Sequence, residues 1–298
     1  MLNAGGHTAR SGGLRALVLG LGVAALLAGC SRLAFGVANL AARSGAFERH
    51  ADLAYGPADR RTLDVYAPRG AHDAPVIVFF YGGAWTRGSK EDYRFVGAAL
   101  AEAGYVTVLP DYRLYPAAPF PLFIQDGAQA VKWVGEHARE YGGNPQQIFL
   151  AGHSAGAHLA AMLAVQSRWL EAAGADPRAI RGLIGLSGPY ALEPNSRTLN
   201  AIFAAPWRAS DWQPAALVMP RAPPALLLHG ADDNVVWPVQ AEKFAAALRA
   251  AGVPVELEIF ADRRHADTVA ALSAPGRRRA PVLEAIQRFI SARSGPSR

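Results

Sequence analysis

One short stretch constrains this 298-residue chain more than any other, because it joins a strand pattern to a helix pattern through Gly-x-Ser-x-Gly. The apolar run at 148–151 has the length of a buried strand, and the Ala, Leu and Met residues after Gly156 favour a helix. Glycines at 152 and 156 permit a tight turn and a close approach of neighbouring backbone. The stretch therefore predicts that Ser154 is a nucleophile held on a sharp turn between a strand and a helix.

Strand and helix patterns alternate along most of the chain. Apolar, β-branched runs predict buried strands at 75–81 and 106–109. Further strands are expected at 148–151, 183–186, 225–229 and 255–260. Helices are expected at 93–103, at 121–141, from the serine turn to about Ser167, at 238–252 and at 281–292. This alternation is typical of an α/β protein with a mostly parallel central sheet and helices on both faces.

Two regions depart from the alternation. Near-alternating residues at 55–66 predict an antiparallel hairpin at the start of a single domain, which we expect to span 51–298. The segment at 190–224 is rich in Pro, Ala and Trp and predicts a small cap inserted over the site. The aromatic side chains that such a cap must bury are Phe203, Trp207 and Trp212.

The first thirty residues have the pattern of a secretory signal. Basic residues precede an apolar run at 16–28 that is too short to span a bilayer comfortably. The run ends in Leu-Ala-Gly-Cys, which resembles the lipobox of bacterial lipoproteins, and Cys30 is the only cysteine of the chain. The resemblance implies a signal peptide at 1–29 and lipidation of Cys30. An ordinary secretory signal and an uncleaved anchor are the alternatives.

Lipidation would place the protein in the cell envelope of a bacterium. Residues 30–50 would then form a lipidated tether between the membrane and the domain. The residue after the cysteine is Ser31 rather than aspartate, which favours the outer membrane, facing the periplasm. The expected membrane contact is therefore a lipid anchor at Cys30.

Charge and cysteine content limit the classes of partner and cofactor. Removing Arg10 and Arg15 with the signal leaves 28 basic groups against 24 acidic ones, so the formal charge falls from +6 to +4. Such a weak excess without a long basic block does not indicate nucleic-acid binding. A single cysteine excludes an internal disulfide and a thiolate metal cluster. With no metal motif and no phosphate-cradling loop either, we expect no metal and no cofactor.

A serine hydroxyl needs a base to take its proton and an anion to orient that base. Residues with these roles follow the later strands of a parallel sheet, in the chain order serine, acid, histidine. After the strand at 225–229, the pattern His-Gly-x-x-Asp-x-x-Val resembles the acid loop of α/β-hydrolases and favours Asp233 over Asp232. After the strand at 255–260, His265 is the expected base. The other nearby histidines, assigned to packing or support, are His153, His158 and His229.

The negative oxygen that forms during attack on a carbonyl needs backbone N–H donors aimed at it. One donor is expected to be the amide of Ala155, directly after the nucleophile. The others are expected from the glycine-rich loop after the strand at 75–81, where we assign the amides of Gly83 and Ala84. We therefore expect an oxyanion hole built from these three amides.

Several motifs together resemble one branch of the α/β-hydrolases, from about Tyr55 to the C-terminus. They are Gly-Gly-Ala-Trp at 82–85, Asp-Tyr-Arg-Leu at 111–114 with Pro116, Tyr-Gly-Gly-Asn-Pro at 141–145 and Gly-His-Ser-Ala-Gly-Ala-His-Leu at 152–159. This branch includes hormone-sensitive-lipase-like esterases, kynurenine-formamidase-like enzymes and small bacterial acetyl and feruloyl esterases. The family usually has histidine before the Gly-Gly pair, whereas this chain has Tyr81. We interpret Asp111 and Arg113 as a structural pair that braces this loop.

The resemblance implies an α/β-hydrolase fold and a carboxylesterase that cleaves small acyl esters through a serine, histidine and aspartate triad. An amidase of the kynurenine formamidase type is the second enzyme hypothesis, and long-chain lipase activity is disfavoured because the expected cap is short. A non-catalytic binding lipoprotein on a hydrolase scaffold is the alternative from another class. The sequence leaves open the acyl and alcohol groups of the substrate and the oligomeric state.

Overall fold

The computed structural model describes residues 35–39 and 45–294. The expected signal peptide at 1–29, the proposed lipidation site Cys30 and much of the expected tether therefore lie outside the described residues. Residues 38–298 form one compact unit, and the fold described below belongs to it. Within the described ranges, the helices are too short or too polar to cross a membrane.

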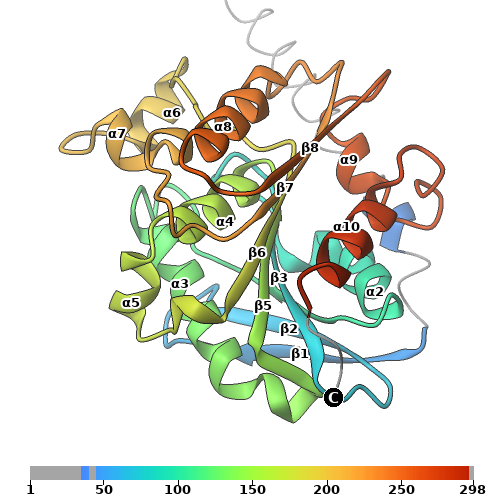
Figure 1. Ribbon diagram of the computed structural model, residues 1–298. Helices are drawn as coiled ribbons and strands as arrows, with labels where there is room; N and C mark the ends of the chain where they lie inside the picture. Colours follow the sequence, from blue (N-terminus) through green and yellow to red (C-terminus); the bar gives the residue numbers. More distant parts are fainter. Residues whose placement is uncertain (1–34, 40–44, 295–298) are drawn as a thin grey trace, which may run out of the picture. The chain divides into compact units, whose positions relative to one another are not determined.

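An eight-stranded sheet organises this unit (Figure 1), in the order β1-β2-β4-β3-β5-β6-β7-β8. Strands β3 to β8 run parallel to one another, while β2 is antiparallel to both β1 and β4. Their bounds are β1 Phe47–Ala54, β2 Thr62–Pro68, β3 Ala74–Phe80, β4 Val106–Pro110, β5 Gly143–His153, β6 Ile180–Leu186, β7 Ala225–Gly230 and β8 Val255–Phe260. The central strands are apolar throughout because both of their faces are covered.

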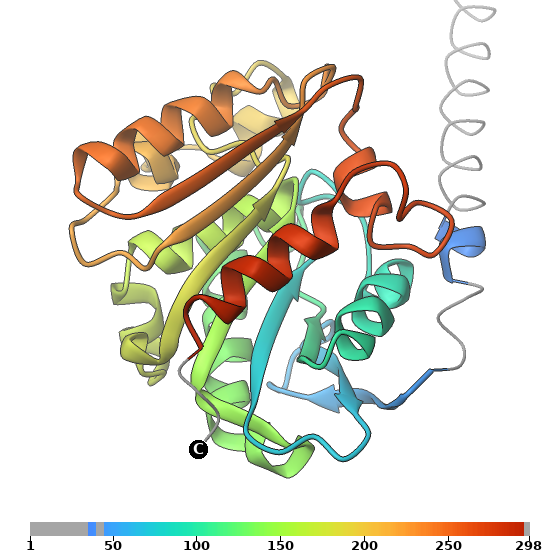
Figure 2. The same cartoon turned by 45° about the vertical axis from the view of Figure 1, so that its right-hand side comes forward.

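Helices cover both faces of the sheet (Figures 1 and 2). One face carries α2 (Arg94–Glu102), α9 (Asp267–Ala270) and α10 (Val282–Ser291), and the other carries α3 (Leu122–His137), α4 (Ala155–Val165), α5 (Arg168–Ala173) and α8 (Val239–Ala250). In α10 the buried residues recur at helical spacing and face the sheet, whereas α4 is buried on every side. The helix that follows Ser154 is therefore held in the interior of the unit.

The antiparallel hairpin lies upstream of its expected position. Its first strand is β1, which begins at Phe47, four residues before the expected domain start at Ala51. Residues 55–61 form the turn, and β2 supplies the second strand. The charged, half-exposed sequence of β1 is typical of an edge strand, and this explains why an apolar pattern did not indicate it.

The segment between β6 and β7 forms a small cap of short helices, α6 (Arg197–Ile202) and α7 (Ala209–Trp212), with a 3-10 turn, η5 (Pro214–Ala216). Phe203 and Trp212 are buried and Trp207 is half-buried. His158 on α4 donates from Nε2 to the Trp212 carbonyl at 2.7 Å, and the Trp85 ring meets Phe203 edge to face at 5.0 Å. The cap is thus attached directly to the elements that carry the site.

Candidate active site

Ser154 occupies a strained turn between β5 and α4. Its backbone has φ 54° and ψ −122°, a conformation that a non-glycine residue adopts only at a cost of about 1–3 kcal/mol. A Cβ at Gly152 would lie 2.4 Å from the backbone of Gly156, and a Cβ at Gly156 would lie 2.0 Å from the Phe80 carbonyl oxygen. Both glycines are therefore required by close backbone approach, as the motif predicts.

The structure brings the three predicted side chains together at the carboxyl ends of their strands. Nε2 of His265 lies 2.9 Å from Oγ of Ser154, and Nδ1 of the same ring lies 2.8 Å from Oδ2 of Asp233. A hydroxyl, an imidazole and a carboxylate thus form one continuous hydrogen-bonded path. This arrangement can remove a proton from the serine as its oxygen attacks a carbonyl carbon.

Asp233 is 3% exposed and fully engaged. Its Oδ1 accepts the amides of Val235 and Val236, and Nε2 of the buried His229 lies 3.2 Å from Oδ2. Burial alone would raise the pKa of Asp233, but hydrogen bonds from His229 and His265 outweigh it and hold the pKa well below its usual range. The carboxylate of Asp233 is therefore ionised at neutral pH.

The other aspartate and histidines that were candidates for the acid and the base lie elsewhere or make different hydrogen bonds. Asp232 is exposed at the surface. His153 bonds to the carbonyl of His265, His158 to that of Trp212, and His229 to that of Val236. Among the described residues, His265 is the histidine that reaches the Ser154 hydroxyl.

The loop after β3 lies against the nucleophile. A Cβ at Gly82 would lie 3.0 Å from the Cβ of Ser154, and the backbone has positive φ at both Gly83 (139°) and Ala84 (52°). Within the described part of the chain, the amides of Gly83 and Ala84 have no hydrogen-bond acceptor. These two donors, with the amide of Ala155 at the start of α4, are available to a negatively charged oxygen.

Tyr81 and Arg60 support this loop from behind. The phenol oxygen of Tyr81 accepts a hydrogen bond from Nη2 of Arg60 at 2.6 Å, and the same nitrogen donates to the Gly88 carbonyl at 2.7 Å. The hydroxyl of Tyr112 donates to the Tyr81 carbonyl at 2.8 Å. Burial raises the pKa of Tyr81 well above its ordinary value, so the phenol stays protonated. Arg60 therefore links the two ends of the segment 81–88.

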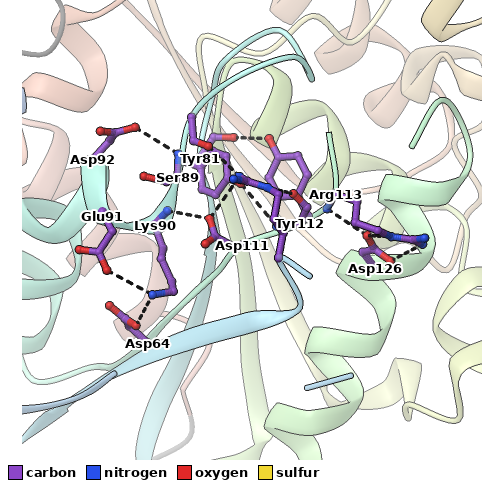
Figure 3. Close-up of polar contacts among 12 residues, drawn as sticks. Asp64, Tyr81, Ser89, Lys90, Glu91, Asp92, Asp111, Tyr112, Arg113 and Asp126 are labelled. Carbon is purple, nitrogen blue, oxygen red and sulfur yellow. Dashed lines mark hydrogen bonds and ion pairs between the residues drawn. The ribbon is translucent and has the colours of Figure 1, made fainter. Parts of the chain in front are cut away.

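The expected pairing of Asp111 with Arg113 is wrong. Asp111 accepts the amide of Lys90 at 2.9 Å and lies 3.5 Å from Nη2 of Arg60, whereas Arg113 binds the fully buried Asp126 on α3. Figure 3 shows the two acidic side chains on opposite sides of Tyr112. Asp111 and Arg113 have different partners because the buried carboxylate of Asp126 needs a cation, and Arg113 supplies it.

A cluster of three carboxylates, Asp52, Asp64 and Glu91, lies beyond Asp111. The buried Nζ of Lys90 is 2.9 Å from Asp64 (Figure 3). It is also 2.5 Å from Asp52, and Arg49 binds Asp64 as well. Side-chain cations of the chain therefore balance this acidic group.

Comparison with known proteins supports this geometry. The BD-FAE family model matches residues 63–248. A probable isoprenylcysteine alpha-carbonyl methylesterase of Oryza sativa is 32% identical over 235 residues, which cover 72% of this chain and 57% of the relative. Esterase LipQ of Mycobacterium tuberculosis is 30% identical, over 86% of this chain and 66% of the relative. The chain thus spans between about half and two thirds of the length of these two relatives.

Solved structures show the same architecture. A thermophilic esterase of the planctomycete Thermogutta terrifontis, Est2 with propionate bound, has a TM-score of 0.68 and 26% identity, covering 83% of this chain and 94% of its own. A truncated carbohydrate esterase from gut microbiota has a TM-score of 0.72 at 21% identity, over 83% and 97% of the two chains. These similarities confirm the predicted α/β-hydrolase fold and the resemblance to its esterases.

Proposed function

Because the chain belongs to the BD-FAE family, we propose that it hydrolyses carboxylic esters of small acyl groups through an acyl-enzyme intermediate on Ser154. The observation that carries the proposal is the continuous hydrogen-bonded path from Ser154 through His265 to Asp233. The fold does not require a hydrogen-bonded path at a strained, half-buried turn. The path is explained if it activates the Ser154 hydroxyl beside free amide donors.

The proposed reaction assigns each group one role. His265 takes the proton of Ser154 as its oxygen attacks the ester carbonyl, and the amides of Gly83, Ala84 and Ala155 stabilise the oxyanion. His265 then protonates the leaving alcohol and afterwards activates the water that releases the acyl group. Asp233 holds the imidazole in orientation and stays ionised throughout.

Three observations support small substrates. The cap between β6 and β7 is short and its aromatic residues are packed inward, which leaves little surface for a long acyl chain. The similar esterase of Thermogutta terrifontis binds propionate. The relative of Oryza sativa is named a probable methylesterase, which supports testing methyl esters.

The test is hydrolysis of p-nitrophenyl acetate, butyrate, octanoate and palmitate by the purified protein and its Ser154→Ala variant. Turnover is expected to fall from the short to the long esters, and the variant should lose roughly 10⁴-fold or more. Equal turnover by the two proteins would refute the proposal. A formyl-amide in parallel tests the amidase hypothesis, and labelling of Ser154 by a fluorophosphonate excludes a purely binding role.

We also propose that Cys30 carries a lipid that anchors the protein to a bacterial membrane, most consistently the outer membrane facing the periplasm. The support is the sequence pattern that ends in Leu-Ala-Gly-Cys. Mass spectrometry of the mature N-terminus should find a lipidated Cys30, and Cys30→Ala should move the protein from the membrane to the soluble fraction. A mature protein that begins elsewhere, or that fractionates identically after the substitution, contradicts the anchor.

A further inference from the structure

Two buried side chains outside the triad connect the oxyanion loop, residues 82–85, to the proposed base His265. Tyr93, at the end of the 3-10 helix η2 (Lys90–Tyr93), accepts a hydrogen bond from the Gly82 amide at 3.2 Å. Its hydroxyl lies 3.0 Å from Nδ1 of His153, the last residue of β5. Nε2 of His153 in turn lies 3.1 Å from the carbonyl oxygen of His265. The series runs from one half of the site to the other.

The hydrogen bonds of this series have only one consistent direction. A backbone carbonyl can only accept, so Nε2 of His153 must carry the proton and donate to His265. In the neutral ring, Nδ1 is then an acceptor and takes the hydroxyl proton of Tyr93, whose oxygen remains free to accept from Gly82. Each polar atom is satisfied, as buried groups must be.

The surroundings keep His153 in this state. Its side chain is 6% exposed, and that of Tyr93 is 3% exposed. Burial, with a smaller effect of the neighbouring His265, lowers the pKa of His153 to about 3. The imidazole therefore stays neutral while His265 gains and loses a proton.

The oxyanion loop packs closely against His153. A Cβ at Gly82 would lie 2.9 Å from Nδ1 of His153, so this loop rests directly on the imidazole. On the other side, the His265 carbonyl has one further donor, the hydroxyl of Thr268, at the longer distance of 3.4 Å. A shift of the His153 ring would therefore displace the oxyanion loop and the base together.

We propose that Tyr93 and His153 are positioning residues that couple the oxyanion loop to His265, so that donors and base reach the reacting carbonyl in register. The inference rests on the proposed function, because it takes His265 as the base and Gly83 and Ala84 as the oxyanion donors. Neither positioning residue touches the substrate or transfers a proton. When the loss of a supporting residue shifts a reacting group by about 1 Å, turnover can fall about 10²-fold.

The test uses His153→Phe, Tyr93→Phe and the double variant, assayed on p-nitrophenyl acetate. Each single variant should lower kcat by roughly 10- to 100-fold, with KM changed by less than about threefold. The double variant should be no slower than the slower single variant, since both substitutions break one series. His153→Gln, whose amide offers a donor and an acceptor, should regain most of the lost turnover.

A control separates coupling from general damage to the fold. Tyr105→Phe removes a phenol whose pKa is also raised by burial, directly before β4, and should leave kcat unchanged. Folded single variants with wild-type kcat, or losses that multiply in the double variant, would overturn the coupling. If His153→Phe does not fold, the Tyr93→Phe and His153→Gln variants still decide the question through the same kcat values.

A second readout does not depend on turnover. In the inactive Ser154→Ala protein, ¹⁵N NMR of the imidazoles should show His153 as the Nε2-protonated neutral tautomer from about pH 5 to about pH 8. Tyr93→Phe in that background should shift the signals of both His153 and His265. An Nδ1-protonated His153, or His265 signals indifferent to Tyr93, refutes the coupling. A wild-type protein without esterase activity refutes the proposed function instead.

Discussion

Tyr81→Phe removes the hydroxyl that supports the oxyanion loop from behind. The ring is 1% exposed and stacks on Tyr112 with centroids 4.6 Å apart, so removing the oxygen leaves the packing intact and creates no large cavity. The lost oxygen accepts from Arg60 at 2.6 Å and, more weakly, from the Tyr112 amide at 3.4 Å. A hydrogen bond to a charged group contributes about 1.5–3 kcal/mol.

The expected cost lies toward the lower end of that range. The Arg60 side chain is 36% exposed and keeps its bond to the Gly88 carbonyl, so water and the remaining acceptors replace part of the loss. We expect the free energy of unfolding to fall by about 1–2 kcal/mol in urea titrations, and Tm by roughly 2–6 °C. The slope of the titration should not change.

A double-mutant cycle with Arg60→Met assigns the effect to the pair. The cycle should return a coupling energy of about 1 kcal/mol between Tyr81 and Arg60, and kcat should fall in each variant because the oxyanion loop loses its support. Additive effects on stability, or a Tyr81→Phe protein as stable as the wild type, would show that the short contact with Arg60 contributes nothing.

Two further predictions concern the turn and the acid. Gly156→Ala should lower the free energy of unfolding by at least about 3 kcal/mol or prevent folding, because its Cβ would overlap the carbonyl oxygens of Phe80 and Tyr81. The control Gly135→Ala, on α3 with open space around it, should raise the free energy of unfolding by about 0.5–1 kcal/mol. Equal effects of the two substitutions would contradict the steric argument. The pKa of Asp233 is lower in the folded chain than its unfolded value of about 3.9, so its ionised form contributes stability above about pH 4 that is lost as the pH falls through the folded value. Asp233→Asn should therefore lose stability less steeply below about pH 4 in urea titrations, and parallel curves would refute this.

The positions of Ser154, Asp233 and His265 were predictable because each residue has a local signature. Ser154 lies in a five-residue motif, and Asp233 and His265 lie in the loops that follow β7 and β8, which a parallel sheet brings to one edge. The fold class followed from the alternation of strands and helices for the same reason. Assigning the catalytic roles themselves requires the activity measurements above.

The supporting residues could not be found in this way, because long-range pairing decides them. Arg60 lies in a turn after an edge strand that has no apolar pattern, and its partner Tyr81 is 21 residues away. Asp111 and Arg113 stand close in the sequence yet bind different elements. His153 occupies a variable position of the motif, and its contact with residue 265 spans 112 residues. Contacts between residues so far apart in the chain leave no periodic pattern in the sequence that could predict them.

The sheet itself explains why His265 needs support that Ser154 does not. Strands β3 and β5 are direct neighbours with Phe80 opposite Gly152, so the oxyanion loop and Ser154 are held by one continuous hydrogen-bonded ladder. His265 instead follows β8, an edge strand with a single partner and a half-exposed side-chain pattern. Edge elements open more readily than central ones. Contacts from outside that ladder, those of Asp233 with the ring and of His153 with the carbonyl, must therefore hold the base in place.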